Sequence, residues 1–598
     1  MSSDHSSEIH WMDWSDAAFE RAEREDKLIL LSMGASWCHW CHVMDRTTFS
    51  NPEVVAMLNE RFVPVRVDGD KRPDIQDRYL LGGWPTTAFL LPDGRVLTGT
   101  TFIPPEAMLQ KLREADALYH DHKPLITAQV TSMAAQAEAD RVEAEISQGA
   151  FDEGVLEGLD IVLKRSFDHV NGGFGGEPKF PYPDAVRYAF LRHRRTGDPE
   201  MLEIALKTLD AMMGIYDPVW GGFYRYAIGG DWTQPHYEKM LYVQAGALDN
   251  FCEAYQVTAD NRYGEVAAGI KAYIEQSLMD SEKGGFYASQ DADMGSHDPS
   301  ADLILGEAYF PLSDSERREI GIPHVDKTIY TDQNGMMISA YLRLHHVMGD
   351  HSARDFALKT ADRILAENMH GGGMCHYSDG EPRVIGDLPD QVHFARALVD
   401  AYQSSGRKIY LAHAERIAEF LIRELRDVVD GGFYFQPFDP RAKGELLERH
   451  KPFDENAAAA ELLTKLHCLT GKEVYRDLAA RTLNAVAFPQ TMESIIGVGL
   501  GQALDLFIHQ PLRIVVVGNR GRPETMEMVE TGLHAYEPAK LVQILDPDED
   551  DLTIGELTYE AAESPAAYVC GADFCRAPIM GSEDLAAVLD DVLSGPPS

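Results

Sequence analysis

A Gly-Gly-aromatic element recurs through the middle of the chain and constrains the fold more than any other feature. Between its copies, over residues 151–510, apolar residues are spaced as in amphipathic helices. Loops that return at the same point of successive helical hairpins gather on one face of the array. We therefore expect an all-α toroid with a loop-lined mouth, although an open helical solenoid would show the same repeat. The copies are Gly172-Gly173-Phe174, Gly221-Gly222-Phe223, Gly284-Gly285-Phe286 and Gly431-Gly432-Phe433, with a degenerate copy at Gly372-Gly373-Met374.

The segments on either side of the repeats have a different pattern, and 598 residues are too many for one core. Residues 1–123 read as strand, helix, strand, hairpin and helix, which favours a small α/β domain with helices on both faces of its sheet. Residues 124–150, rich in Ala, Glu and Gln, predict a helical connector. Two strand patterns within residues 511–598 predict a small C-terminal α/β region.

Charge and cysteine usage exclude several classes of function. The net charge is −42, which repels nucleic acid and acidic lipid surfaces, so we expect no nucleic-acid partner. No apolar run is long enough to span a membrane, and the first twenty residues lack a basic region followed by an apolar one. We expect a cytoplasmic protein with no membrane partner. Seven widely spread cysteines do not suggest a disulfide framework.

One tight cysteine pair, Cys38 and Cys41, follows a predicted buried strand over residues 28–33 that ends at Gly34. A thiol at a helix N-terminus is stabilised as thiolate by unpaired N–H groups and the helix dipole, which favours attack by Cys38 on a disulfide. Cys41 lies one helical turn later and is placed to resolve a mixed disulfide. His39 between them would stabilise the thiolate further.

Three other interpretations compete for the same residues. Cys38-His39-Trp40-Cys41-His42 matches the C-x-x-C-H pattern of c-type haem attachment, but the chain shows no export signal. A zinc site would need further ligands, and no second C-x-x-C or H-x3-H cluster lies nearby in the sequence. The cysteines could also be buried structural residues. We expect no metal and no cofactor.

Trp84-Pro85-Thr86 supplies a second element, because a proline before an inward strand can hold a cis peptide and expose backbone to an incoming extended chain. Together with Trp37 and the cysteine pair, this segment resembles thioredoxins. The run Cys38–Met44 more narrowly resembles the thioredoxin-like domain of the spermatogenesis-associated, DUF255 family. Residues 1–123 are thus identified as a thioredoxin-like domain, with Trp37, His39, Trp84 and Pro85 supporting the pair.

The resemblance extends along nearly the whole chain. It implies that residues 151–510 form an (α/α)6-type toroid similar to six-hairpin glycosidases and N-acylglucosamine epimerases. Two departures from the family pattern are an Asp at 332, before Asn-Gly, and Asp454-Glu455-Asn456-Ala457 in place of Gly-Asn-Ser. The matching segments are Glu177–Pro181, Pro235–Tyr242, Asp291–Asp293 and Ala567–Cys570.

The toroid contains two groups of candidate pocket residues. A cluster at a loop-to-helix junction could supply an acid, a base and a sugar-binding aromatic, and a carboxylate pair after the third Gly-Gly turn could serve glycoside or epimerase chemistry. The alternative for each is helix capping and loop support. The candidates are His236, Tyr237, Glu238 and Lys239 in the cluster, and Asp291 and Asp293 in the pair.

We therefore expect a thiol-disulfide oxidoreductase whose toroid positions a substrate or partner. The alternatives are a carbohydrate-processing enzyme with a regulatory thioredoxin-like domain, and a non-catalytic binding scaffold. The expected partner is a protein client with a thiol or disulfide, or a small carbohydrate. Cys570 and Cys575 could pass electrons to the N-terminal pair, or be two buried thiols without a redox role.

Overall fold

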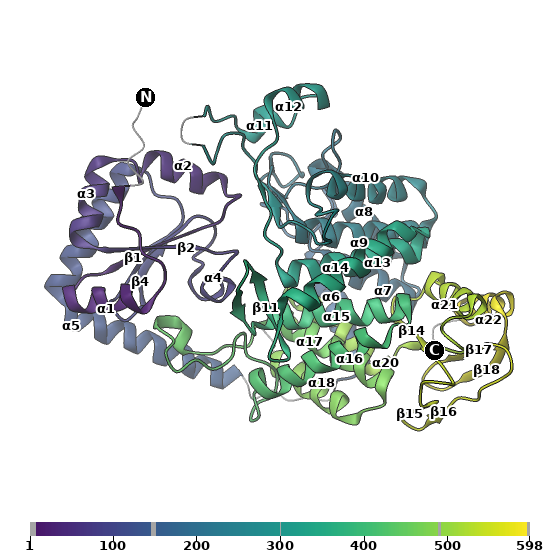
Figure 1. The fold of residues 1–598 in the computed structure, drawn as a ribbon. Coiled ribbons are helices and arrows are strands. Elements are labelled where there is room, and N and C mark those ends of the chain that lie inside the picture. The colour runs from purple at the N-terminus through teal and green to yellow at the C-terminus, as the bar shows by residue number, and fades with distance from the viewer. Residues whose placement is uncertain (1–7, 145–150, 299–300, 488–491, 595–598) are drawn as a thin grey trace. The chain divides into compact units, whose positions relative to one another are not determined.

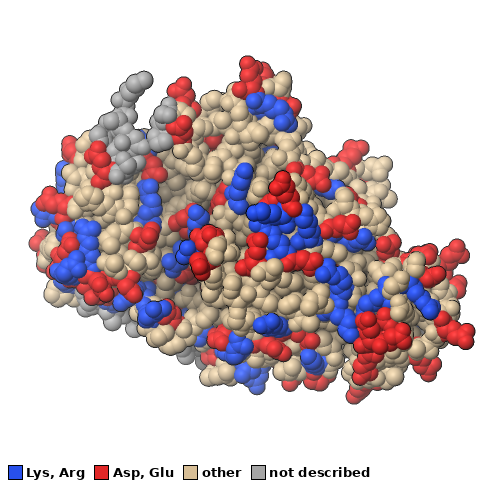
Figure 2. All heavy atoms as spheres, viewed as in Figure 1, with Lys and Arg blue, Asp and Glu red and all other residues tan. Residues whose placement is uncertain are grey.

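The computed structural model describes residues 8–144, 151–298, 301–487 and 492–594. The chain divides into two compact units, neither of them continuous in sequence. Figure 1 shows both, with the N-terminal elements in purple. Within the described ranges, no helix combines the length and apolarity needed to cross a membrane. On the face seen in Figure 2, acidic and basic side chains are interspersed. The first unit comprises Met1–Ile146, Ser289–Asp326 and Gln436–His450, and the second Ser147–Ala288, Lys327–Phe435 and Lys451–Ser598.

A four-stranded mixed sheet with the order β2-β1-β3-β4 forms the centre of the first unit. Strand β1 is buried along its length up to Gly34, pairs in parallel with β2 and pairs antiparallel with β3. Successive side chains of β1 point to opposite faces of the sheet, where two apolar clusters lie. Leu30 belongs to one cluster and Leu31 to the other. Helices cover both faces, as the sequence predicts. The elements are β1 (Ile29–Gly34), β2 (Val63–Asp68), β3 (Thr86–Leu90), β4 (Val96–Thr100), α1 (Asp16–Glu25), α2 (His39–Thr47), α3 (Pro52–Arg61) and α4 (Pro73–Tyr79).

Helix α5 (Pro105–Ala144) follows β4 and is interrupted at His122, where the backbone leaves helical angles just before Pro124. The predicted connector is thus helical as far as Ala144. Its residues 145–150 lie outside the described part of the chain.

Two later segments belong to the first unit, although both fall inside the range expected for the toroid. Residues 289–326 leave and return through the antiparallel pair β8 (Ser289–Gln290) and β9 (Val325–Asp326). Between these strands lie α11 (Gly306–Tyr309) and α12 (Asp314–Ile320). Residues 436–450 pack on the sheet domain, where the backbone N–H of Glu445 donates to the Tyr79 hydroxyl over 2.9 Å.

The second unit contains a closed ring of helical hairpins. Each inner helix packs against two inner neighbours, and α20 contacts both α17 and α7, so the described helices form a toroid rather than an open solenoid. The inner helices are α7 (Pro183–Thr196), α9 (Leu241–Thr258), α13 (Thr331–Met348), α15 (Leu388–Ser405), α17 (Phe453–Thr470) and α20 (Gly501–His509). The outer ones are α6 (Glu153–Ser166), α8 (Pro199–Met212), α10 (Asn261–Ser277), α14 (His351–Asn368), α16 (Lys408–Phe420) and α18 (Glu473–Val486).

The Gly-Gly-aromatic turns join outer helices to the following inner ones, and four of them are fastened by the same device. The fourth residue of the inner helix is an amide whose oxygen accepts the aromatic or Met backbone N–H and whose nitrogen donates to the same residue's carbonyl. The glycines of these four turns adopt positive φ, which favours glycine, except Gly373, which begins β11 (Gly373–Ser378). The pairs are Gln244 with Phe223, Asn334 with Phe286, Gln391 with Met374 and Asn456 with Phe433.

A second sheet, with the order β14-β13-β17-β18, ends the chain and is covered by α21 (Pro523–His534) and α22 (Ser582–Ser594). The two strands predicted near residues 513 and 540 are β13 (Leu512–Val517) and β14 (Lys540–Leu545). Cys570 and Cys575 form a disulfide across the hairpin of β17 (Ala566–Cys570) and β18 (Cys575–Met580), so they are not two separate thiols.

Candidate functional site

The cysteine pair lies where a buried strand meets a helix N-terminus. Cys38 is the N-cap of α2, and the backbone N–H of Cys41 donates to its sulfur over 3.2 Å. The two cysteines form a disulfide, with Cα atoms 5.2 Å apart. Only 3% of the Cys38 surface is exposed, whereas Cys41 is half-buried. The local fold thus places Cys38 where a thiolate gains from the helix N-terminus.

Two tryptophans support this turn. The Trp37 indole N–H donates to the Asp70 carboxylate over 2.6 Å, and its ring lies 5.6 Å from that of Trp84. The Trp84–Pro85 peptide is cis, and Pro85 is buried at the start of β3. Three of the four supporting residues expected from the sequence, Trp37, Trp84 and Pro85, therefore lie around one corner of the sheet domain. The fourth, His39, faces residues from the 289–326 segment.

His39 begins α2, and its Nδ1 donates to the Asp293 carboxylate. Asp293 is 2% exposed at its side chain, and its other oxygen accepts the backbone N–H of Gly306 at the start of α11 over 2.9 Å. The Asp293 carboxylate thus both fixes the His39 ring and bonds the N-terminus of α11 in the 289–326 segment.

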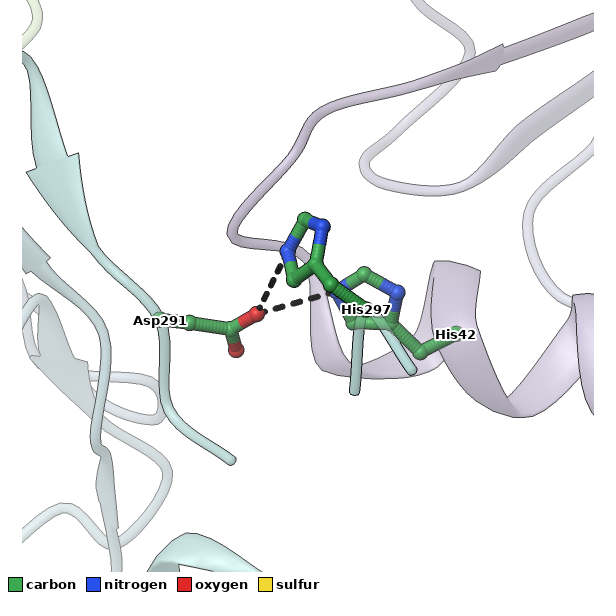
Figure 3. A group of neighbouring side chains, drawn as sticks. All are labelled: His42, Asp291 and His297. Atoms are coloured by element: carbon green, nitrogen blue, oxygen red, sulfur yellow. Dashed lines mark hydrogen bonds and ion pairs between the residues drawn. The ribbon is translucent and has the colours of Figure 1, made fainter. Parts of the chain in front are cut away.

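A second imidazole-carboxylate contact follows on the next turn of α2 (Figure 3). The Nε2 atom of His42 lies 3.1 Å from Asp291 Oδ2 and 2.9 Å from the Ser36 carbonyl oxygen. The Nε2 atom of His297 approaches the same two oxygens, at 3.2 Å and 2.9 Å. Both rings point toward the carboxylate in Figure 3, one from α2 and one from the 289–326 segment.

Electrostatics favour charge separation in this group. Burial opposes ionisation of Asp291, but hydrogen bonds from His297 and His42 outweigh it and lower the pKa of Asp291 to about 2. For His42, burial disfavours the cation, but the hydrogen bond and charge of Asp291, the Ser36 carbonyl and the charge of Asp45 together outweigh it and raise the pKa of His42. Burial and the neighbouring His297 lower the pKa of His324, whose ring stacks 3.9 Å from that of His297.

Further contacts hold the remote segment on α2. The Arg46 guanidinium donates to the carbonyl oxygens of Gly295 and Asp298 over 2.6 Å and 3.1 Å. The Ser36 hydroxyl donates to the Asp326 carboxylate over 3.3 Å. The segment is therefore fastened to α2 near one end, through Arg46, and to the turn before Cys38 at the other, through Ser36.

Asp291 and Asp293 were expected to line a toroid pocket, and the structure places them beside the cysteine pair instead. They follow the third Gly-Gly turn in sequence, but β8 carries the chain out of the helical ring and into the first unit. Their carboxylates are committed to His42 and His39.

The second candidate group remains in the toroid unit with distinct local roles. Lys239 is fully buried, and its ammonium donates to Asp217 and to the Gly221 carbonyl, each over 2.7 Å, so it fastens a Gly-Gly turn. Tyr237 packs edge-on against Tyr224. Glu238 is buried, with Oε2 3.6 Å from His236 Nδ1.

A cavity of 310 Å³ lies close to this group, between α7, α9 and the start of α17. Its lining joins aromatic rings to an Arg, an Asn and two Asp residues, and none of His236, Tyr237, Glu238 and Lys239 is among the described residues that line it. An aromatic stack connects the His236 group with the cavity, because the Tyr226 ring stacks on both His236 and the lining residue Phe180.

Asp454 gives this cavity an acid. Asp454 lines the cavity and its residue surface is exposed, and the partial desolvation of its carboxyl by the surrounding protein together with the charge of Asp184 raises the pKa of Asp454 to about 6. The sequence showed Asp454 only as a departure from the family pattern.

A third polar group was not found from the sequence. His376 Nδ1 donates to Asp390 over 2.9 Å and lies 3.8 Å from Asp332. Burial raises the pKa of Asp332, and the charge of Asp390 adds to the effect. These residues come from α13, β11 (Gly373–Ser378) and α15, so no local spacing in the sequence connects them.

Comparison with known proteins assigns the part that carries the cysteines. The family model Thioredox_DsbH, described as a protein of unknown function, DUF255, matches residues 1–138. The N-terminal part of the chain is thus similar to the DUF255 family. The resemblance read from Cys38–Met44 is thereby confirmed. Asp291, Asp293 and His297 lie outside the matched residues, so a later part of the chain completes the surroundings of the Thioredox_DsbH cysteines.

Similarity to other proteins extends beyond the Thioredox_DsbH domain. Spermatogenesis-associated protein 20 of Homo sapiens is 26% identical over 717 residues, covering 97% of this chain and 90% of that protein. Thioredoxin-1 of Drosophila melanogaster is 32% identical over 72 residues, 12% of this chain and 64% of that protein. A solved cellobiose 2-epimerase from Bacillus thermoamylovorans covers 55% of this chain and 85% of its own, with 14% identity and a TM-score of 0.44.

Proposed function

We propose that this protein carries out thiol-disulfide exchange through Cys38 and Cys41. The observation that carries the proposal is the position of Cys38 at the N-terminus of α2, within bonding distance of Cys41 and with a backbone N–H directed at its sulfur. A thiolate formed there is stabilised before it attacks. The Trp84–Pro85 corner, which packs against Trp37, is where we expect an extended client strand to dock.

The exchange proceeds in two displacements. The Cys38 thiolate attacks one sulfur of a client disulfide, forms a mixed disulfide and releases the other client sulfur as thiolate. The Cys41 thiolate then attacks Cys38, which closes the Cys38–Cys41 disulfide and releases the second client thiolate. The client gains two electrons and the pair loses two. A dithiol reductant returns the pair to the reduced form, and the reverse sequence oxidises a dithiol client.

Access to Cys38 restricts the clients. Because only 3% of its surface is exposed, a folded protein surface does not reach its sulfur. Trp40, two residues after Cys38 on α2, is 44% exposed and offers an apolar contact for a client. The proposed client is therefore an extended peptide segment with a disulfide or thiol.

Reduction of a peptide disulfide by the full chain, with dithiothreitol as electron source, tests the proposal. Cys38→Ser is expected to abolish catalysis, and Cys41→Ser to accumulate a mixed disulfide with the peptide. Cys252→Ser is the matched control, since Cys252 is fully buried and burial raises the pKa of its thiol. Activity that survives Cys38→Ser would refute the proposal.

A second candidate function is binding of a small carbohydrate in the toroid cavity. It is supported by the combination of Phe180 and Tyr242 rings with the Arg225, Asn250 and Asp454 side chains around 310 Å³, a size suited to one small ligand. Asp454 would act as a proton donor, since its pKa of about 6 keeps part of it protonated near neutral pH.

Calorimetric titration with a panel of mono- and disaccharides tests this candidate. Binding that weakens at least about tenfold in Arg225→Ala, but not in Cys38→Ser, would support it. An absence of binding across the panel, or binding that Arg225→Ala leaves unchanged, would count against it.

A further inference from the structure

We propose that His42, Asp291 and His297 bind a divalent transition-metal ion next to the cysteine pair, with the Ser36 carbonyl oxygen as a fourth donor. The proposal concerns a site separate from the two sulfurs and does not depend on their exchange activity. It differs from the expectation of no metal, which considered only ligands close together in sequence.

Four potential donor atoms converge on one point. Each imidazole Nε2 lies 2.9 Å from the Ser36 oxygen, and the Nε2 atoms of His42 and His297 lie 3.1 Å and 3.2 Å from Asp291 Oδ2. Metal-ligand bonds of about 2.0–2.1 Å separate two donors by roughly 2.9 Å at an octahedral angle and roughly 3.3 Å at a tetrahedral one. The observed separations fall within this interval. The three side-chain donor atoms lie within 4.8 Å of one another.

The surroundings hold these donors in place. The Ser296 hydroxyl donates to Asp291 Oδ2 over 2.7 Å, and the backbone N–H of Asp293 donates to Asp291 Oδ1 over 3.0 Å. His297 stacks on His324, which sets the plane of its ring. Partners of this kind orient ligands in metal sites.

The site also has an entry path. Asp291 has no exposed side-chain surface, but the His297 side chain is 35% exposed. An ion can reach the donors from this side, and a water molecule can complete its coordination there. Figure 3 shows that the two rings approach the carboxylate from different elements, so the ion would also tie the 289–326 segment to α2.

The donor types select the class of ion. Two imidazole nitrogens with a carboxylate and a carbonyl oxygen suit Zn²⁺, Fe²⁺, Co²⁺ or Ni²⁺ better than Ca²⁺ or Mg²⁺, which prefer all-oxygen sites. Zn²⁺ and Co²⁺ are therefore the probes, and Co²⁺ reports its geometry through its absorption spectrum.

The test is a Zn²⁺ titration of the full chain in competition with a chromophoric chelator, after chelator treatment and with the cysteines oxidised. We expect one site that His297→Ala weakens at least tenfold and that Ser296→Ala weakens by about tenfold. Added Zn²⁺ should raise the melting temperature of the parent chain but not of His297→Ala. Because His297 is near the surface, its loss leaves the fold intact, which circular dichroism in the absence of metal will verify.

Matched variants separate this site from others. Cys38→Ser with Cys41→Ser should retain Zn²⁺ affinity within about threefold, whereas loss of binding would show that the site requires the cysteine pair and would overturn the proposal. His351→Ala and His376→Ala remove residues of two other His-carboxylate groups and should have no effect. No Zn²⁺ uptake by the parent chain, or uptake that His297→Ala leaves unchanged, would also overturn it.

Discussion

His42 and Asp291 are 249 residues apart in the chain, yet His42 Nε2 lies 3.1 Å from Asp291 Oδ2. The parallel contact of His39 with Asp293 spans 254 residues. The helix that carries the cysteines is therefore held by carboxylates that lie outside the residues matched by the Thioredox_DsbH model. We therefore expect the chemistry of the pair to depend on a segment that lies outside residues 1–138.

The contact of His39 with Asp293 should tune the pair. In His39→Ala the Cys38 thiolate loses an adjacent imidazole, so the disulfide form is expected to gain by about 3- to 10-fold in equilibrium with glutathione. In an Asp293→Asn background the same change should have a smaller effect, because the ring is then no longer held. Thiol trapping in glutathione buffers measures all four forms. Equal effects of His39→Ala in both backgrounds would show that Asp293 has no role in positioning His39.

The side-chain amides that bond the Gly-Gly turns of the toroid should stabilise the fold, so removing one of them is expected to lower the free energy of unfolding. Asn456→Ala leaves the buried N–H and C=O of Phe433 without their partner, which should cost about 2–4 kcal/mol in the free energy of unfolding. Asn484→Ala is the matched control, since the Asn484 side chain donates to the Ala480 carbonyl of its own helix and its loss should cost less than about 1 kcal/mol. Urea denaturation followed by circular dichroism compares the two variants. Equal losses in the free energy of unfolding would show that the Asn456 amide does not hold its turn.

The Gly-Gly turns were recognisable because glycine pairs at positive φ leave a direct trace in the sequence, and the toroid prediction rested on them. The amides that fasten the turns were not recognised. Gln244 follows its turn by 21 residues and Asn334 follows its own by 48, so the spacing varies with the loop between. Asn334 and Asn456 were visible only within segments that depart from the family pattern.

Alanine substitutions at two glycines of positive φ should separate the cost of the backbone conformation from the cost of a steric clash. Gly222 has φ +75°, and an added Cβ would come within 2.6 Å of the Tyr273 ring. Gly197 has φ +71° with open space around it. Gly197→Ala should cost about 1 kcal/mol, and Gly222→Ala about 1–3 kcal/mol more. If thermal melts show the two variants to be equally stable, the close packing against Tyr273 is not a constraint.

The raised pKa of Asp454 predicts a pH-dependent stability. Between its ordinary range near pH 4 and its folded pKa of about 6, the folded chain holds a proton that the unfolded chain releases. Its contribution to stability is present at low pH and is lost as the pH rises through 6. Asp454→Asn should therefore raise the melting temperature relative to the parent chain more at pH 7.5 than at pH 4.5. The exposed Asp477→Asn serves as control, and a pH-independent difference for Asp454→Asn would contradict the shift.

The surroundings of the cysteines could be predicted only in part. The strand, Trp37, the Trp84–Pro85 corner and the helix N-terminus are local in sequence and were all expected. Asp291 and Asp293 were singled out, but for the wrong neighbourhood, because short-range patterns do not show that a chain leaves one core and joins another. The interval between the Gly-Gly elements at 284 and 372 is the longest in the series, and this length was the available sign of an excursion.

The reversible redox state of Cys38 and Cys41 tests the central claim most directly. The full chain is equilibrated in a graded series of glutathione buffers, quenched, alkylated and analysed by mass spectrometry for the peptide that contains both cysteines. The account predicts a reversible two-electron transition between dithiol and intramolecular disulfide, with a midpoint roughly between the −270 mV of thioredoxin and the −120 mV of DsbA. The account would be contradicted if, at every potential, the peptide carried only one alkylated cysteine or carried glutathione in a mixed disulfide.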